Sequence, residues 1–192
     1  MIGIIPTGLA GVIIFEPKIF RDERGCFFES FNAADFEAAT GIRTRFVQDN
    51  ESVSRYGVVR GLHYQRAPHA QSKIVRVVSG RILDIAVDLR QGSPTVGRHV
   101  AVELSADNRR QLFIPRGFAH GFATLSPQAV VQYKCDAPYT PSAEGGVAWN
   151  DPTLGIRWPL PAEDIVLSAK DAERPALDDC GELFDYRIDY YA

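Results

Sequence analysis

One short segment carries the residue types of an anion-binding site beside a proton carrier. It reads RGLHYQ over residues 60–65. Arg60 is a permanent cation that suits a phosphate oxygen, and His63 can take or give a proton near neutral pH. Together they indicate an enzyme acting on a phosphate-bearing metabolite, although a surface arginine and a satisfied core histidine would give the same pattern. Strict alternation places the two side chains on opposite strand faces, so both can serve one site only if Gly61 allows a bulge or the strand begins there.

Side-chain alternation adds further candidates from other strands. Period-two spacing puts Lys73, His120 and Tyr133 each on the same strand face as apolar neighbours. Polar groups in such an interior need partners. Each residue alone is more often structural, but a lysine, a tyrosine and two histidines (His63 included) together favour a functional site.

Short β-strands are the elements that must position these residues. Polar, turn-forming residues from Asp49 to Gly57 are expected to lead into a strand over residues 58–65. Further strands are expected over residues 73–79, 82–89, 100–104, 111–114, 118–125 and 129–138. Because Gly, Pro and Asn turns separate them at spacings of about ten residues, the sequence predicts an all-β fold, a β-sandwich or jelly roll.

Helices are expected to be few and short. Asn32 can cap a helix that runs through Ala39 and ends at Gly41. Residues 168–171 are expected to open a second short turn or helix. Neither is long enough to change the prediction of an all-β domain.

The N-terminal segment is apolar, but it lacks a basic start, and Pro6 and Gly11 interrupt it. It is therefore expected to form one or two short strands within residues 3–15 rather than a signal peptide. A turn at residues 24–25 is expected to lead into a strand that carries Glu29.

Composition bounds the class of protein. A length of 192 residues suits a single domain over residues 1–192. A net charge of −3 and a pI near 5.8 argue against a nucleic-acid-binding protein, and the lack of any apolar run of about 18 residues argues against a membrane helix. Three widely spaced cysteines without a CxxC pair indicate reduced thiols in a cytoplasm rather than a disulfide frame or a zinc site.

Several segments together resemble the dTDP-4-dehydrorhamnose 3,5-epimerase family, cupin-type jelly rolls of the dTDP-L-rhamnose pathway. The matching segments are PKIFRDERGCFFES, FVQDNESVSRYGVVRGLHYQ, AQSKIVRVVSG, RILDIAVDLRQGSPTVG, RQLFIPRGFAHGF, WNDPTLGIRWP and LSAKD. They cover most of residues 12–172, and their number and order make the resemblance far more specific than RGLH alone. It implies a cupin-like fold, a cofactor-independent isomerase and a homodimer that exchanges N-terminal strands.

The resemblance also implies a role for each matching residue. His63 would be the catalytic base, oriented by Asp171. Tyr133 would be the acid on the opposite side of the sugar ring, and Lys73 would face the C4 oxygen. Tyr139 matches the residue that stacks on the thymine. The other positions expected to hold the nucleotide, its phosphates or the sugar are Arg24, Glu29, Gln48, Asn50, Arg60, His120, Glu144 and Lys170.

The implied chemistry is consistent with these residue types. A ketone at C4 acidifies the hydrogens on both C3 and C5, so one enolate-stabilising group can serve two inversions. Each inversion needs a proton removed from one face and another returned to the opposite face, which calls for two proton carriers such as His63 and Tyr133. Lys73 suits the developing enolate oxygen.

Other functions stay open on the sequence alone. A relative that inverts only C3 or only C5 would retain the same three residues, whereas a non-catalytic jelly roll that binds nucleotide sugars would have no need of them together. A ketoisomerase fits less well, because the matching segments are those of the epimerases. Metal-dependent cupins usually carry a His-x-His pair where this chain has His63-Tyr64-Gln65, so no metal or other cofactor is expected.

Overall fold

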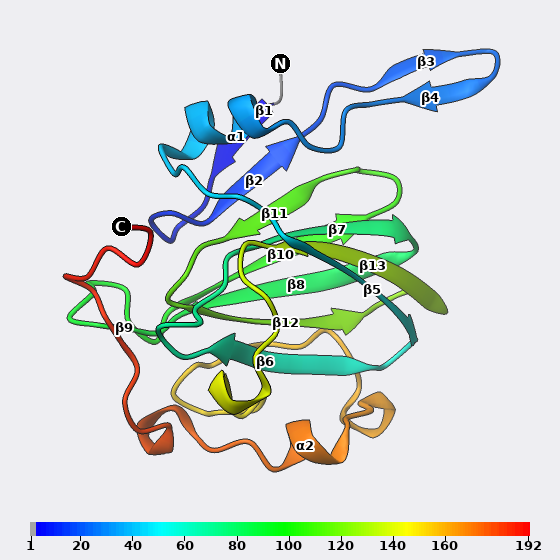
Figure 1. Cartoon of the computed structure of the whole chain (residues 1–192). Helices are drawn as coiled ribbons and strands as arrows, with labels where there is room; N and C mark the ends of the chain where they lie inside the picture. The colour runs from blue at the N-terminus through cyan, green and yellow to red at the C-terminus, as the bar shows by residue number, and fades with distance from the viewer. Residues whose placement is uncertain (1–2) are drawn as a thin grey trace.

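Two β-sheets face each other across the core of the computed structural model, which describes residues 3–192 (Figure 1). In spatial order, the six-stranded sheet comprises β1 (Gly3–Pro6), β2 (Ile13–Glu16), β11 (Gln111–Ile114), β7 (Lys73–Ser79), β13 (Gln128–Cys135) and β5 (Gln48–Arg55). The five-stranded sheet comprises β10 (His99–Ser105), β8 (Arg81–Asp88), β12 (Phe118–Thr124), β6 (Val59–Gln65) and β14 (Glu144–Gly146). Apart from β1 and β2, neighbouring strands are not consecutive in the chain, and all pairs within the two sheets are antiparallel, which confirms the predicted jelly roll.

Smaller elements lie outside the two sheets. They are the β3 (Phe20–Asp22) and β4 (Gly25–Phe27) hairpin, the parallel pair β9 (Arg90–Gln91) and β15 (Phe184–Asp185), the helices α1 (Ala33–Thr40) and α2 (Ala169–Ala172), and 3-10 turns at Pro141–Ala143, Ala162–Asp164 and Leu177–Asp179. No helix among residues 3–192 is long and apolar enough to cross a membrane.

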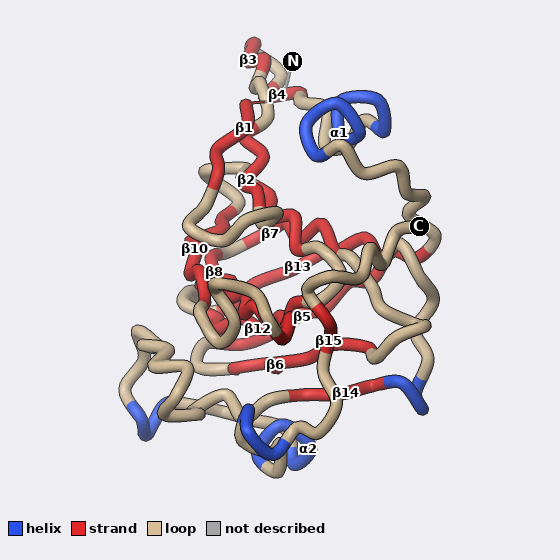
Figure 2. Tube along the Cα trace, turned by 90° about the vertical axis from the view of Figure 1, so that its left-hand side faces the viewer, coloured by secondary structure: helices blue, strands red, loops and turns tan. Residues whose placement is uncertain are grey.

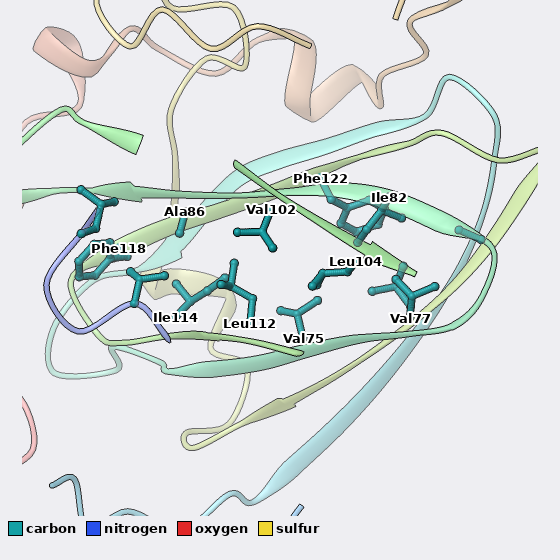
Figure 3. Close-up of a cluster of buried hydrophobic side chains, with 14 residues drawn as sticks. Val75, Val77, Ile82, Ala86, Val102, Leu104, Leu112, Ile114, Phe118 and Phe122 are labelled. Carbon is teal, nitrogen blue, oxygen red and sulfur yellow. The ribbon is translucent and has the colours of Figure 1, made fainter. Parts of the chain in front are cut away.

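Alternating apolar side chains fill the space between the two sheets (Figure 3). Val75 and Val77 project inward from β7, and Ile82 and Ala86 project inward from β8 to meet them. β10 packs against both β7 and β11, which closes one flank of the sandwich. The polar residues that share these inward faces therefore gather toward the other flank, beside β5 and β6.

The outer face of the five-stranded sheet carries a second core. Leu62, Ile85 and Val87 are fully buried there against residues of the C-terminal part of the chain, among them Leu154 and Phe184. α2 lies beneath β6 and β14 on this side of the molecule (Figure 2). This packing fixes α2 against the strand that carries the RGLHYQ segment.

Helix α1 forms as its caps predict. The side chain of Asn32 accepts hydrogen bonds from the backbone N–H groups of Ala34 and Asp35, and Gly41 ends the helix at φ 70°, in the left-handed region that glycine adopts without strain. Phe36 is the buried residue of the helix, and its ring meets that of Phe113 edge to face at 5.0 Å.

The segment before the RGLHYQ strand was predicted wrongly. Residues expected to form a polar lead-in are strand β5, which pairs with β13 along its whole length, from Gln48 opposite Cys135 to Arg55 opposite Gln128. Exposure alternates along β5 although both of its faces are polar. The inward face is polar because it borders a cavity rather than the apolar core, so the usual hydrophobic alternation of a strand is missing.

Two further differences concern short strands. β14 lies in a stretch predicted to be loop, and it pairs with β6 through only three residues. The strand expected to carry Glu29 ends at Phe27, so Glu29 follows it in an extended segment. Strands this short bury too little to leave a clear sequence signal.

The β3–β4 hairpin extends away from the sandwich (Figure 1). Every residue of both strands is exposed, and Phe20 and Phe27 keep 53% and 70% of their surface accessible while packing on each other at 6.5 Å. Two large aromatic side chains that no other part of residues 3–192 covers indicate a contact surface.

Candidate active site

A cavity of about 580 Å³ opens between the two sheets on the flank opposite β10. Its walls are β5, β7 and β13 on one side and β6 on the other, and α2 with the segment before it forms the rim. The predicted site residues that line it are Gln48, Asn50, Arg60, His63, Lys73, Tyr133, Tyr139, Glu144, Lys170 and Asp171. A deeper recess of about 140 Å³ adds His120 and Ser52 and shares Lys73, His63 and Tyr133 with the main cavity.

A bulge at Gly61 brings Arg60 and His63 to the same cavity, as the sequence required. Along the β6–β12 pair, His120 lies opposite His63 and Phe122 lies opposite Arg60. Between these two paired positions β6 therefore has one residue more than β12, which is a β-bulge. Gly61 has φ 107°, and a Cβ atom there would lie 2.6 Å from the carbonyl oxygen of His120. Glycine is therefore required at the point where the strand changes face.

His63 is held by a buried carboxylate. Its Nε2 atom lies 2.5 Å from Oδ1 of Asp171, a residue of α2 that is only 5% exposed. Burial raises the pKa of Asp171, but hydrogen bonds from His63, Ser168 and the Gly61 backbone outweigh burial and leave that pKa below its usual value. An ionised Asp171 accepts the Nε2 proton, so Nδ1 of His63 keeps its lone pair for accepting another.

Lys73 and His120 form a second polar group deeper in the cavity. Nε2 of His120 lies 2.7 Å from Oδ1 of Asp84, and both residues are buried. Burial lowers the pKa of His120 despite the opposing effect of Asp84, so the ring is neutral at pH 7. Burial also lowers the pKa of Lys73, while Cys135, Asp84 and Glu144 oppose that effect. A desolvated ammonium group interacts strongly with any negative charge that develops beside it.

Tyr133 stands on the sheet opposite His63. It projects from β13 in the six-stranded sheet, whereas His63 projects from β6 in the five-stranded sheet. The Lys73 Nζ atom lies 5.9 Å from the centre of the tyrosine ring. Burial and Cys135 raise the pKa of Tyr133, and the charge of Arg60 opposes them. The phenol therefore keeps its proton at neutral pH, as a proton donor must.

Arg60 spans the two sheets at the cavity wall. Its Nε donates to Oγ of Ser54 at 3.0 Å, and its Nη2 approaches the carbonyl of Val53 at 3.5 Å, both on β5. The β5 strand thus orients a guanidinium that β6 carries, and the group faces the cavity beside Gln48 and Asn50. This polar wall suits an anionic ligand.

A charged cluster lines the rim. Glu144 accepts hydrogen bonds from Lys170 Nζ at 2.6 Å and from the Tyr139 hydroxyl at 2.5 Å, and it also pairs with Arg174. Burial raises the pKa of Glu144, but its three partners outweigh burial and lower that pKa from 4.5 to about 2. Gln48 accepts the backbone N–H of Tyr139 at 2.9 Å, which fixes the loop that carries the exposed tyrosine ring.

This cluster should make folding stability pH-dependent. The folded-state pKa of Glu144 lies below its unfolded value, so its stabilisation is present above about pH 4.5 and is lost as pH falls toward 2. We expect Glu144→Gln to lower the free energy of unfolding by roughly 2–3 kcal/mol at pH 7 and by much less near pH 3. Urea unfolding of both forms at several pH values measures this difference. Glu103→Gln is the control, because Glu103 is half exposed and lies 4.0 Å from Arg81; a difference for Glu144→Gln that does not change with pH would contradict the assignment.

Two predicted site residues lie away from the cavity. Arg24 stands at the turn of the β3–β4 hairpin, where its side chain is 90% exposed and pairs with Asp22 at 2.6 Å. Glu29 is exposed and borders a separate small hollow near α1. Within one copy of the chain, neither side chain joins the other site residues.

Sequence reasoning missed three residues of the site. Ser52 borders the deeper recess, and its hydroxyl is buried without a hydrogen-bond partner among residues 3–192. Ser54 orients Arg60, and Arg174 pairs with Glu144. The two serines alternate with Asn50 along β5, so recognising that strand would have revealed them. Arg174 lies two residues beyond the end of α2, and no local spacing in the sequence pointed to its pairing with Glu144.

The described residues show no metal-binding cluster. Within residues 3–192, no group of three or more His, Cys, Asp or Glu side chains is arranged to hold a metal ion. His63 and His120 are each hydrogen-bonded to a different carboxylate.

Comparisons with known proteins identify the family of the chain. A family model described as dTDP-4-dehydrorhamnose 3,5-epimerase matches residues 6–179. A protein of that name from Salmonella typhimurium is 53% identical over 178 residues, covering 93% of this chain and 97% of its own length. A crystal structure from Legionella pneumophila, described as a dTDP-6-deoxy-D-glucose-3,5-epimerase in complex with dTDP-4-keto-L-rhamnose, is 48% identical with a TM-score of 0.94, covering 98% of this chain and all of its own. A 3'-monoepimerase from Streptomyces bikiniensis in complex with dTDP-quinovose is 36% identical with a TM-score of 0.87, covering 94% and 92% of the two chains.

The fold and the cavity together define a cupin-like jelly-roll isomerase of the kind that acts on sugar nucleotides. Within that class, the chain belongs to the dTDP-4-dehydrorhamnose 3,5-epimerase family. The resemblance read from the sequence segments is confirmed.

Proposed function

We propose that the protein inverts C3 and C5 of dTDP-4-dehydro-6-deoxy-D-glucose to give dTDP-4-dehydro-L-rhamnose. The observation that carries this proposal is the placement of His63 and Tyr133 on opposite sheets of one cavity, with the partly buried Lys73 beside them. A sugar ring lying between the two sheets would have one proton carrier on each face. The names and bound ligands of close relatives support the same substrate.

The proposed reaction begins with proton removal. His63 takes the proton from C5 or C3 through its free nitrogen, and the C–H electrons form an enolate whose negative charge rests on the C4 oxygen. Lys73 stabilises that oxygen, and Asp171 stabilises the imidazolium that forms on His63. Tyr133 then delivers a proton to the opposite face of the same carbon, which inverts it. His63 and Tyr133 exchange protons with solvent before the second carbon reacts.

We further propose that polar side chains of the walls and rim hold the rest of the substrate. Arg60, Gln48 and Asn50 suit the diphosphate, and His120 suits the sugar. Lys170 and Glu144 flank the exposed ring of Tyr139, which suits stacking on thymine. Binding energy from these remote groups positions the sugar between the two proton carriers.

Removing the Arg60 guanidinium should mainly weaken nucleotide binding. We expect Arg60→Ala to raise the Kd for dTDP by roughly 10–100-fold, because a charged hydrogen bond to phosphate contributes about 1.5–3 kcal/mol. Isothermal titration calorimetry with dTDP measures the change. Arg81→Ala is the matched control, because Arg81 lies at the start of β8 outside the cavity. Equal dTDP affinity in the two variants would show that Arg60 does not bind the phosphates.

The activity is tested by incubating the protein with dTDP-4-keto-6-deoxyglucose in deuterium oxide and following C3 and C5 by NMR. We expect deuterium at both carbons together with inversion at both. Deuterium and inversion at C3 alone would establish a monoepimerase, the second candidate and the activity named for the Streptomyces bikiniensis protein. If the dTDP-sugar binds but no deuterium enters at either carbon, the protein is a non-catalytic binding protein.

We propose that the enzyme acts as a homodimer in the cytoplasm. β2 pairs with β11 of the same chain, so the segment free to reach a partner is the β3–β4 hairpin, with exposed Phe20 and Phe27. Such an exchange would bring Arg24 to the nucleotide in the partner's cavity. The three cysteines are free, which agrees with a reducing compartment. Sedimentation analysis tests the assembly, and a monomer at the concentrations used for turnover would contradict it.

A further inference from the structure

The C-terminal end of the chain returns to the sandwich and joins a buried polar network. This segment, red in Figure 1, runs up one side of the molecule from the region of α2. Phe184 of β15 is 3% exposed and packs on Tyr64 and on Tyr190, so the segment is anchored before its last residues. Tyr191 lies beyond that anchor and makes a different set of contacts.

Tyr191 joins a network that centres on a carboxylate. Its hydroxyl lies 2.6 Å from Oγ of Ser72 and accepts the backbone N–H of Arg116 at 3.0 Å. Arg116 donates through Nη1 to the carbonyl of Tyr190 at 2.6 Å and through Nε to Asp136 at 3.1 Å. Asp136 in turn accepts the backbone N–H of Ser72 at 2.6 Å, which closes the ring of contacts.

The network lies one residue from the catalytic cavity. Ser72 precedes Lys73, Asp136 follows Cys135, and Lys73 and Cys135 are paired neighbours on β7 and β13. Ser72 is fully buried, and its side chain and backbone both take part. The network therefore fixes the backbone from which the long Lys73 side chain enters the cavity.

We infer that Tyr191 is a positioning residue, which acts on the reaction by holding Ser72 and so aiming Lys73 at the enolate oxygen. This inference rests on the proposed function of Lys73. A lysine side chain has several rotatable bonds, so a small shift of its backbone is passed to the ammonium group. Misplacement of a catalytic group by about 1 Å can cost roughly 100-fold in rate.

The hydroxyl of Tyr191 can be removed without disturbing the anchor. Tyr191→Phe keeps the aromatic ring over the Arg116 guanidinium, 5.0 Å away, and deletes only the two hydrogen bonds to Ser72 and the Arg116 backbone. Tyr190→Phe is the matched control in the same segment, because its hydroxyl accepts the N–H of Asp185 and does not touch the network.

A double-mutant cycle with Lys73 tests the inference. We expect Tyr191→Phe to lower kcat by about 10-fold and to leave KM and the dTDP affinity within about two-fold, with Tyr190→Phe unchanged. In a Lys73→Met background, whose slow C3 and C5 deuterium exchange is followed over long incubations, Tyr191→Phe should change the rate by less than about two-fold. Equal losses in both backgrounds, or wild-type kcat in Tyr191→Phe, would overturn it.

Two further measurements keep the result decisive. If Lys73→Met shows no exchange, the kcat and the dTDP affinity of Tyr191→Phe test the inference instead. A loss of kcat with unchanged dTDP affinity supports a positioning role for Tyr191, whereas a parallel loss of dTDP binding refutes it. Melting temperatures and the fraction of dTDP-binding sites correct each rate for folded protein. If the wild-type protein shows no turnover, the proposed function itself is wrong. If the wild type is active and Tyr191→Phe is equally active, only the inference about Tyr191 is wrong.

Discussion

Replacing His63 by alanine is expected to stop both isotope exchange and inversion, with a loss of at least the roughly 10²–10⁴-fold that a general base contributes. The reason is that neither C3 nor C5 can lose a proton, so no enolate forms. NMR in deuterium oxide measures both processes in one sample. Binding of dTDP should persist, because Arg60 and the rim residues remain in place.

The matched control for this prediction is His99→Ala. His99 is on β10, the edge strand at the far side of the five-stranded sheet, and does not border the cavity. It should retain wild-type exchange at both carbons. Rapid solvent exchange in His63→Ala would show that another group removes the proton, and the pairing of His63 with Asp171 would then need a different explanation.

Much of the fold was readable from the sequence because turns and alternation are local signals. The strands over residues 73–79 and 111–114 have the predicted bounds, and Asn32 and Gly41 cap α1 as expected. β5 was missed because its inward face serves a polar cavity instead of the apolar core. Where one face of a strand borders a ligand site, polar ligand-binding residues occupy the positions that would otherwise be apolar, so the alternation that identifies a strand is lost.

The candidate site was only partly readable for a related reason. Alternation grouped Lys73, His120 and Tyr133 with core residues, and it showed that Gly61 had to relieve the conflict at His63. Which strands lie opposite each other is a property of topology, and alternation carries no information about it. The placement of His63 and Tyr133 on facing sheets therefore came from the structure.

The hairpin residues show another limit of a single chain. Arg24 matches a nucleotide-binding position by its segment, yet it lies on a projecting hairpin and pairs only with Asp22 among its immediate neighbours. Local sequence predicts the turn at Gly25, whose φ is 131°, but it does not predict that the hairpin stands exposed, away from the sandwich. If the proposed homodimer completes the nucleotide site, the contacts within one copy of the chain cannot show it.

Replacing Tyr133 by phenylalanine should separate exchange from inversion. The ring and its packing against the core remain, but the proton donor on the second sheet is lost. His63 can still remove a proton and return one to the same face, so deuterium should enter at C3, C5 or both. Inversion at C5 should fall by about 10²–10⁴-fold, the usual contribution of a general acid.

Exchange without inversion is the signature that distinguishes this variant from His63→Ala, in which both are lost. NMR of the sugar carbons gives the deuterium content and the configuration from the same spectra. Tyr186→Phe provides the control, since Tyr186 is 43% exposed and packs near Arg90 outside the cavity. If Tyr133→Phe inverts both carbons at the wild-type rate, the proton must reach the second face by another route, and the assignment of one proton carrier to each sheet is wrong.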